Sequence, residues 1–150
     1  MKASGIITLT TDFGEQDGYV GQMKGAILSI HPRACIVDVT HAVAPHDVSA
    51  AAFVLGSIYR YYPPGTVHLV VVDPGVGTAR APLAMAAGGW YFVGPDNGVL
   101  SWPLQREPNL QVVHLSKPGY WRGDVSATFH GRDVFAPVSA HLARGAPLAD

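Results

Sequence analysis

The segment 67–72 reads VHLVVV and is almost uniformly apolar. A strand with apolar side chains on both sides must be covered on both faces, which is typical of parallel strands inside an α/β domain. The chain before this segment alternates between β-branched runs and apolar residues at helical spacing. We therefore predict an α/β fold with a mostly parallel central sheet and helices on both faces.

Glycine and proline residues mark where the expected elements end. Pro32 closes the first helix, and Pro63-Pro64-Gly65 closes the second, for which Asp47 is the expected N-cap. Gly88-Gly89 separates two short apolar runs and predicts a β-hairpin. Strands are expected at 5–11, 35–40, 67–72, 82–87, 90–93 and 110–115, and helices at 19–30, 47–61 and 134–144.

Charge and composition exclude several classes of partner. Only 14% of the 150 residues are charged, and the 10 basic and 11 acidic side chains are spread along the chain, so we expect no nucleic acid and no membrane as partners. The single cysteine, Cys35, forms no internal disulfide, and no HxH or HExxH motif indicates a metal site. The first residues lack the apolar core of a signal peptide. We expect a cytoplasmic protein that uses no cofactor and no metal.

Polar residues stand where three apolar runs end. Asp12 follows GIITLTT, Asp73 follows VHLVVV, and Asp96 and Asn97 follow WYFVGP. Ligands of open α/β sheets bind beyond the carboxyl ends of the strands. One such aspartate is more often a loop cap, but carboxylates gathered at one edge shift each other's pKa and indicate a functional site.

Two further motifs carry candidate catalytic groups. In DPGVGTAR, two glycines and a proline fix an irregular turn that can return Arg80 to Asp73, either as part of a site or as an ion pair that closes the loop. Phosphate is not the expected ligand, because no P-loop and no GxGxxG motif is present. In TFHGRDVFAP, His130 can act as acid, base or water-orienting group. We expect Asp133 to cap the last helix and Arg132 to pair locally.

Five segments occur in the order and approximate spacing of one enzyme family. They are TLTTDFGEQDGYVGQMKG, VTHAVAPHDVSAAAFVL, VVDPGVGTAR, FVGPDNGVLS and TFHGRDVFAP. Through these segments the chain resembles the S-adenosyl-L-methionine hydrolases, or SAM hydroxide adenosyltransferases, which are relatives of fluorinase and chlorinase. The resemblance spans essentially the whole chain.

The resemblance implies that S-adenosylmethionine is split into adenosine and L-methionine by in-line attack of water or hydroxide at the ribose 5′ carbon. The leaving group is a neutral thioether, so the reaction needs an oriented nucleophile rather than a general acid. The family's water-handling set maps onto Asp73, Arg80 and His130, and Asp12 matches the aspartate that holds the ribose hydroxyls. The implied substrate-binding residues are Asp12, Phe13, Asp17, His46, Asp96 and Asn97.

Members of this family continue into a second, smaller β-rich domain and build each active site between neighbouring subunits of a homotrimer. We therefore expect residues 1–150 to form the N-terminal domain alone, without the C-terminal β-rich domain. Two alternatives stay open: a halide as the nucleophile, or a non-catalytic nucleoside-binding or trimer-forming module. Water is favoured over halide because Arg80 and His130 fill the space in which the halogenating relatives bind halide.

Overall fold

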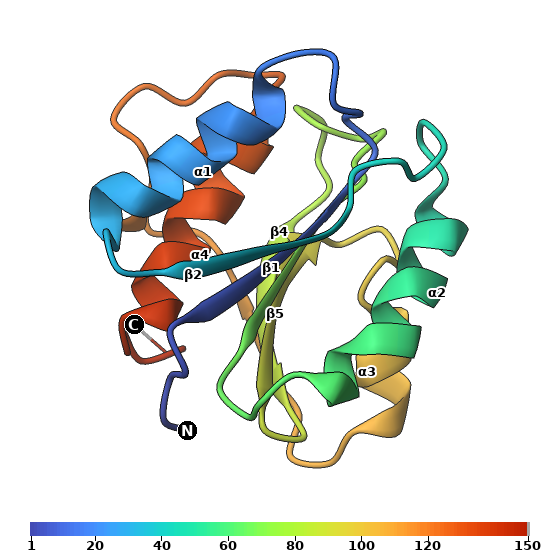
Figure 1. Cartoon of the computed structure of the whole chain (residues 1–150), viewed down its shortest axis with the longest axis vertical. Helices are drawn as coiled ribbons and strands as arrows, with labels where there is room; N and C mark the ends of the chain where they lie inside the picture. The colour runs from blue at the N-terminus through green and yellow to red at the C-terminus, as the bar shows by residue number, and fades with distance from the viewer. Residues whose placement is uncertain (150) are drawn as a thin grey trace.

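The secondary structure alternates along the chain as the sequence predicts. The computed structural model describes residues 1–149 (Figure 1). Its elements are β1 (Ile6–Thr11), α1 (Tyr19–Ile30), β2 (Cys35–Thr40), α2 (Val48–Ile58), the 3-10 turn η1 (Tyr59–Tyr61), β3 (Val67–Val71), β4 (Pro82–Ala87), β5 (Trp90–Pro95), α3 (Ser101–Arg106), β6 (Gln111–His114), the 3-10 turn η2 (Pro118–Tyr120), the π-helical turn η3 (Gly131–Phe135) and α4 (Ala136–Ala143).

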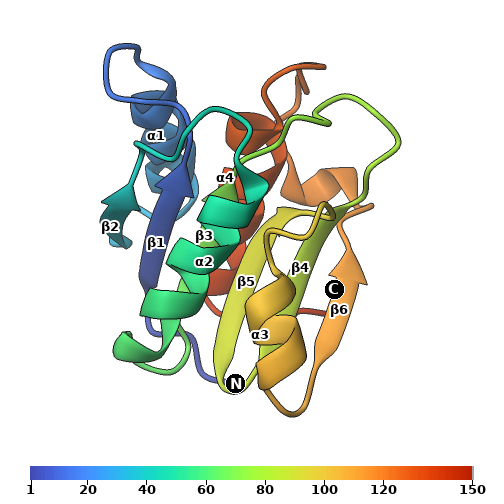
Figure 2. The same cartoon turned by 90° about the vertical axis from the view of Figure 1, so that its right-hand side faces the viewer.

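The strands form one sheet in the order β2-β1-β3-β5-β4-β6. The pairs β1/β2, β1/β3 and β3/β5 are parallel, whereas β4 pairs antiparallel with both β5 and β6. Helices α1 and α4 cover one face of the sheet, and α2 and α3 cover the other (Figures 1 and 2). The prediction of a mostly parallel sheet with helices on both faces is therefore confirmed.

The predicted hairpin joins β4 to β5. Gly88 has φ +60° and Gly89 has φ +107°, and a two-residue hairpin turn of this kind needs positive φ at both central positions. Two glycines adopt this backbone without the steric cost that a Cβ atom would add.

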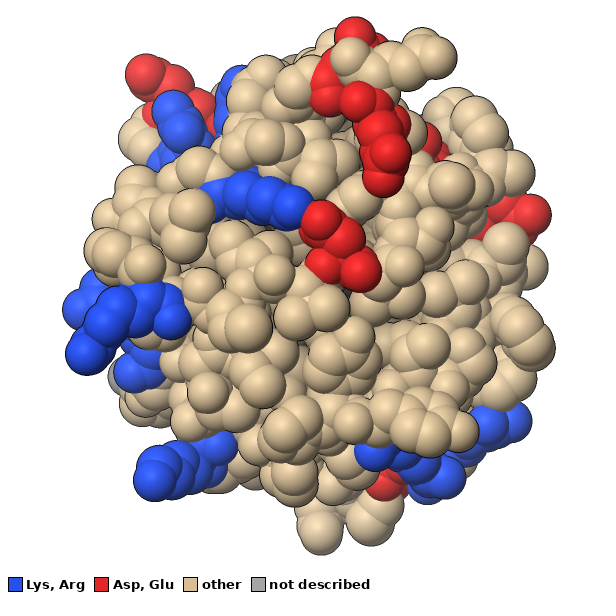
Figure 3. All heavy atoms as spheres, viewed as in Figure 1, with Lys and Arg blue, Asp and Glu red and all other residues tan. Residues whose placement is uncertain are grey.

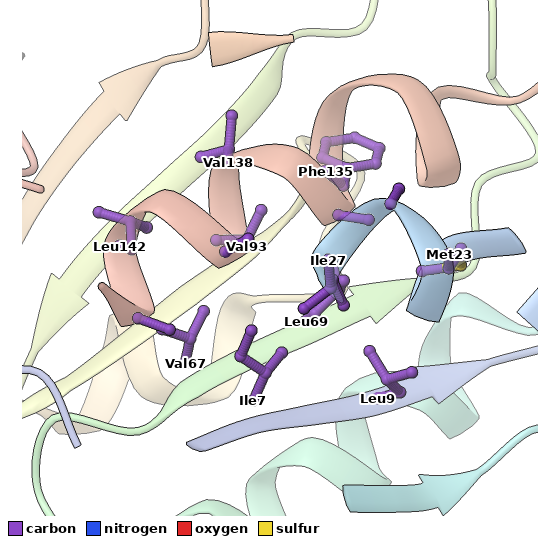
Figure 4. Close-up of a cluster of buried hydrophobic side chains, with 14 of the residues drawn as sticks. Ile7, Leu9, Met23, Ile27, Val67, Leu69, Val93, Phe135, Val138 and Leu142 are labelled. Carbon is purple, nitrogen blue, oxygen red and sulfur yellow. The ribbon is translucent and has the colours of Figure 1, made fainter. Parts of the chain in front are cut away.

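Two hydrophobic clusters hold the helices to the sheet. The cluster under α1 and α4 includes five side chains that are 0% exposed: Ile7, Met23, Ile27, Leu69 and Phe135 (Figure 4). Burial of each such side chain contributes about 1.5–3 kcal/mol. Successive strand residues point to opposite faces, so Val70, the residue after Leu69 on β3, belongs to the second cluster under α2. That cluster includes Leu55, Tyr59, Val70, Met85 and Phe92.

Outside these clusters the surface carries few charges. Figure 3 shows that the face turned toward the viewer in Figure 1 is mostly uncharged, as the low share of charged residues predicts. Within residues 1–149, no helix is long and apolar enough to cross a membrane.

Three differences from the sequence-based expectation involve more than two residues. Helix α2 ends at Ile58, and its last turn tightens into η1. Helix α3 was not predicted, because its six residues are too few to establish a helical period. The last helix begins with the π-helical turn η3, five residues before α4. The predicted cap at α2 is confirmed, since the Asp47 carboxylate accepts a hydrogen bond of 2.9 Å from the Ala50 amide.

One buried histidine lies in the middle of the sheet, away from any strand end. His68 on β3 is 0% exposed; its Nδ1 lies 2.8 Å from Thr8 Oγ1, and its ring stacks on Phe92 at 5.4 Å between centroids. Burial lowers the pKa of His68 to about 3, because an imidazolium cannot be hydrated there. His68 therefore stays neutral in the folded protein at physiological pH.

This difference in pKa predicts a pH-dependent stability. Between pH 6.5 and 3, His68 is protonated in the unfolded chain but stays neutral in the folded protein. The free energy of unfolding therefore falls as pH falls, by at most about 1.4 kcal/mol per pH unit. Denaturant unfolding between pH 7 and 4.5 should show a flatter dependence for His68→Gln than for the wild type. The matched control His114→Gln, at an exposed position on β6, should keep the wild-type slope. Equal slopes in all three proteins would contradict the assignment.

Candidate active site

A cavity of about 290 Å³ opens where β1 and β3 end. Because these strands are parallel neighbours, with Thr11 opposite Val71, the residues that follow them emerge side by side. Four loops gather here, at the top of Figures 1 and 2, with residue ranges 12–18, 41–47, 72–81 and 121–130. The cavity is lined by Asp12, Phe13, Pro45, His46, Val71, Asp73, Val76, Thr128, Phe129, His130 and Gly131.

Asp73, Arg80 and His130 form one connected chain of side chains. Arg80 binds the Asp73 carboxylate with two hydrogen bonds, of which the one from Nε to Oδ1 measures 2.9 Å. The second nitrogen of the guanidinium, Nη2, also lies 3.0 Å from His130 Nδ1. The Asp73 and Arg80 side chains are only 5% and 9% exposed. The turn predicted from DPGVGTAR therefore does return Arg80 to Asp73. His130, 50 residues further along the chain, reaches the same place from the loop before η3.

The contact with Arg80 fixes the proton on His130. A guanidinium carries only donors, so Nδ1 must accept and the neutral imidazole holds its proton on Nε2. Burial, and then the positive charge of Arg80, lower the pKa of His130 and keep the ring neutral. Since the Asp73 oxygens are engaged by Arg80, the cluster offers N–H donors to a bound oxygen atom rather than a strong base.

Asp12 connects the first loop to the loop after β2. Its Oδ2 accepts a hydrogen bond of 2.8 Å from the His46 amide. His46 reaches this position with φ +66°, a left-handed conformation that is uncommon for residues other than glycine. Among residues 1–149, no group donates a hydrogen bond to Asp12 Oδ1. A carboxylate oxygen at the cavity wall is thus available to a hydroxyl of a ligand.

Aromatic rings form a second side of the cavity. Phe13 and Phe129 meet edge to face at 5.7 Å between centroids, and Tyr19 packs edge to face on Phe129 at 5.4 Å. A Cβ atom at Gly131 would lie 3.3–3.4 Å from both phenylalanine rings and from Val71, so glycine lets the backbone approach this wall closely. Phe129 was not predicted as a site residue, although it directly precedes His130 in the sequence.

Three predicted substrate-binding residues lie outside this cavity. Asp17 is exposed in the loop before α1, and Asp96 is exposed after β5. The Asn97 side-chain Nδ2 donates a hydrogen bond of 2.9 Å to the Val72 carbonyl, and Asn97 Oδ1 accepts one of 3.2 Å from the Val99 backbone amide. Asn97 therefore ties the turn after β5 to the end of β3, and its contact with substrate stays a prediction, as do those of Asp17 and Asp96.

The expectation that Asp133 caps the last helix is wrong. Asp133 lies inside η3, is 0% exposed, and accepts two hydrogen bonds from the Arg132 guanidinium at 2.6 and 2.9 Å. It also accepts 2.9 Å from the Ser126 amide and faces Arg122 Nε at 3.4 Å. Burial acts to raise the pKa of Asp133, but these hydrogen bonds and charges outweigh it and lower the pKa. The expected local pairing of Arg132 is confirmed.

These contacts hold the loop that carries His130. Asp133 ties Ser126 and Arg122 to the start of η3, and Arg132 lies over the Phe129 ring at 4.9 Å while donating 2.8 Å to Gln22 of α1. Short π-helical turns are frequent at functional sites, where an extra residue in the turn re-aims neighbouring side chains. Here the turn begins directly after His130.

No metal-binding cluster accompanies this geometry. Among residues 1–149, no group of three or more His, Cys, Asp or Glu side chains is arranged to hold a metal ion. What the cavity offers is a set of oriented hydrogen-bond donors at one side, a carboxylate at another, and an aromatic wall. Such a site suits a small organic ligand with hydroxyl groups and an apolar ring.

Comparison with known proteins identifies the family. Residues 7–150 match the model of the SAM hydroxide adenosyltransferase N-terminal domain. The chain therefore belongs to this family, and the resemblance inferred from its five segments is confirmed. The family is one of enzymes: curated relatives that are 41–50% identical to the chain are named (R)-S-adenosyl-L-methionine hydrolase, and more distant ones are named fluorinase.

Individual relatives show how much of the protein the chain represents. It is 50% identical over 145 residues to the (R)-S-adenosyl-L-methionine hydrolase of Salinispora tropica, covering 96% of this chain and 55% of the relative. A fluorinase of Actinoplanes sp. is 31% identical over 173 residues, and the match covers 99% of this chain and 58% of the fluorinase. The solved structure of an uncharacterized conserved protein from Thermotoga maritima superimposes with a TM-score of 0.92 at 43% identity. The match covers 95% of this chain and 56% of that protein. The chain thus spans about half the length of the relatives it matches.

The buried carboxylate of Asp133 generates a stability prediction. Asp133→Asn removes the charge that Arg132 and Arg122 face, and hydrogen bonds to charged groups contribute about 1.5–3 kcal/mol each. We expect a loss of about 2 kcal/mol in the free energy of unfolding, measured by urea denaturation at pH 7. Asp124→Asn, an exposed position in the same loop, serves as the control and should stay within about 0.5 kcal/mol of the wild type. An equal effect of both substitutions would contradict the role given to Asp133.

Proposed function

We propose that this chain supplies the nucleoside-binding and water-handling part of an S-adenosyl-L-methionine hydrolase, which forms adenosine and L-methionine. The observation that carries the proposal is the continuous Asp73–Arg80–His130 chain at the edge of the cavity. It combines a buried guanidinium with a neutral imidazole that donates from Nε2. Family membership and the names of the relatives support the same reaction.

The proposed reaction places each group in one role. Arg80 and His130 hold a water or hydroxide in line with the bond between the ribose 5′ carbon and sulfur, and Asp73 orients Arg80 and offsets its charge. As the oxygen attacks, the carbon–sulfur bond breaks and its electron pair leaves with the neutral thioether of methionine. The proton released from water passes to solvent. Holding the two reactants in this geometry makes the step effectively unimolecular and so lowers its barrier.

Electrostatics favours a cationic substrate. Asp12 and Asp73 contribute two negative charges at the cavity, and Arg80 contributes one positive charge, so one negative charge is left over to attract the sulfonium. Asp12 Oδ1 is available to the ribose hydroxyls, and the Phe13 and Phe129 rings exclude water from the apolar part of the ligand.

A second candidate function is a non-catalytic nucleoside-binding or trimer-forming module. It needs only the Asp12 carboxylate and the Phe13 and Phe129 rings, which line the cavity whether or not a nucleophile is held there. The assignment of residues 1–150 to the N-terminal domain of the family, the homotrimer, the cytoplasmic location and the absence of a cofactor belong to the proposal as predictions. So do the substrate contacts of Asp17, Asp96 and Asn97.

Product analysis tests the function. Incubation with S-adenosylmethionine should release equal amounts of adenosine and methionine, whereas 5′-chloroadenosine in the presence of chloride would support the halide alternative. Calorimetric titration with adenosine runs in parallel. Binding without turnover in the wild type would support the module. The absence of both binding and turnover would overturn the proposal.

Substitutions separate chemistry from binding. His130→Ala removes a donor to the nucleophile, so we expect turnover to fall by about 100-fold or more while adenosine binding changes little. Asp12→Ala removes the contact to the ribose hydroxyls, so adenosine affinity should fall by about 10-fold or more. His114→Ala, on the exposed strand β6, is the control and should change neither quantity. Unchanged turnover in His130→Ala would contradict the role of this residue.

The contact between Arg80 and His130 also predicts a pH dependence. Protonated His130 would turn an N–H at Nδ1 toward the Arg80 donors, so the contact is lost as pH falls through the pKa of His130, which burial and Arg80 place below its ordinary value. NMR titration of the His130 ring should give a higher pKa in Arg80→Gln than in the wild type, because a positive charge is removed. A lower pKa in the variant would contradict the contact.

A further inference from the structure

A chain of hydrogen bonds lies behind the Asp12 loop, outside the cavity lining. The Phe13 amide donates to Thr11 Oγ1 at 3.2 Å, and Thr11 Oγ1 lies 2.8 Å from His41 Nδ1. His41 Nε2 lies 2.9 Å from Asp38 Oδ1, and Lys24 donates to Asp38 Oδ2 at 2.6 Å. Thr11 is 0% exposed and His41 is 5% exposed. The chain thus runs from the site loop, through two buried side chains, to an ion pair at the surface.

With a neutral imidazole at His41, one arrangement of protons satisfies every link of this chain. The Asp38 carboxylate accepts only, so His41 donates from Nε2 and its Nδ1 accepts from the Thr11 hydroxyl. The Thr11 oxygen is then left to accept from the Phe13 amide. Burial acts to raise the pKa of Asp38, but the hydrogen bonds from Lys24 and His41 and the charge of Lys24 outweigh it and lower the pKa, so the carboxylate stays ionised.

The backbone of His41 holds the same loop a second time. Its carbonyl accepts 2.8 Å from the Gly14 amide, and Gly14 adopts φ +68°, which suits glycine. Of the two residues after Asp12, Gly14 has its amide satisfied by His41 directly, and Phe13 has its amide satisfied by Thr11, whose hydroxyl contacts His41. The Asp12 carboxylate in turn accepts a hydrogen bond from the backbone amide of His46, which lies in the same loop after β2 as His41.

We propose that His41 is a positioning residue that, through Thr11 and through its own carbonyl, holds the Asp12–Gly14 loop in the conformation that presents the Asp12 carboxylate to a ribose. This rests on the proposed function only in that a nucleoside is the ligand of Asp12. His41 itself does not line the cavity. It acts by fixing the backbone on which Asp12 and Phe13 stand, so its loss weakens binding of the nucleoside rather than the attack on the 5′ carbon.

The same strand offers a matched control. Thr8 of β1 also bonds a buried histidine, with its Oγ1 2.8 Å from His68 Nδ1, but neither Thr8 nor His68 contacts the cavity. Thr11→Val and Thr8→Val each remove one buried hydroxyl and leave one imidazole nitrogen without its partner, and Thr11→Val also leaves the Phe13 amide without its acceptor. Both variants should lose similar stability. Only Thr11→Val should lower adenosine affinity, by about 5- to 10-fold, with Thr8→Val within about twofold of the wild type.

Rescue variants separate positioning from simple destabilisation. Thr11→Ser keeps the hydroxyl and should retain most of the affinity lost in Thr11→Val. His41→Asn places an amide oxygen near the position of Nδ1 and should retain more affinity than His41→Leu. Where turnover of S-adenosylmethionine is measurable, Thr11→Val should raise KM and leave kcat nearly unchanged. An equal loss of affinity in Thr11→Val and Thr8→Val would overturn the proposal.

Hydrogen exchange tests the positioning without any ligand. The Phe13 and Gly14 amides should exchange at least about 10-fold faster in Thr11→Val than in Thr8→Val at matched global stability. If the wild type binds no adenosine, the proposed function fails, and the exchange rates still decide whether His41 holds the loop. Equal exchange in both variants, or faster exchange with unchanged adenosine affinity, would overturn the inference.

Discussion

The buried ion pair between Asp73 and Arg80 is the interaction on which the rest of the site depends. Moving two charges to positions 5% and 9% exposed costs several kcal/mol for each ion. Two parallel hydrogen bonds, the contact with His130, and the Phe135 ring 5.3 Å from the guanidinium offset this cost. The pair therefore sets the path of the loop after β3, the tautomer of His130 and the charge of the cavity together.

Two further carboxylates, outside the cavity lining, stabilise the loops that carry the site residues. Asp133 holds the loop that carries His130, and Asp38, through His41 and Thr11, holds the loop that carries Asp12. Neither carboxylate lines the cavity. Residues on loops keep a defined geometry only when a second set of contacts locks them, and here each locking carboxylate pairs with a cation, Arg132 or Lys24.

Local patterns in the sequence were sufficient where the interactions are local. The alternation of periods predicted the strands and long helices, Gly88-Gly89 predicted the hairpin, and Asp47 was identified as the cap of α2. Helix α3 escaped prediction because six residues carry no clear period. Asp133 was mistaken for a cap because its position at the start of a helix suggests one, whereas its partners Ser126 and Arg122 come from the preceding loop.

The sequence by itself determined the α/β class, the positions of the polar residues at the strand ends, and the family, because periodicity and the order of motifs need no coordinates. Only the tertiary structure decided which of those residues meet. Asp12, His46, Asp73 and His130 line one cavity, while Asp17, Asp96 and Asn97 do not. The chain of hydrogen bonds through His41 could likewise not be predicted, since it joins side chains of α1, β1, β2 and the loop after β2. Contacts of this kind depend on strand register and loop paths, which long-range packing sets.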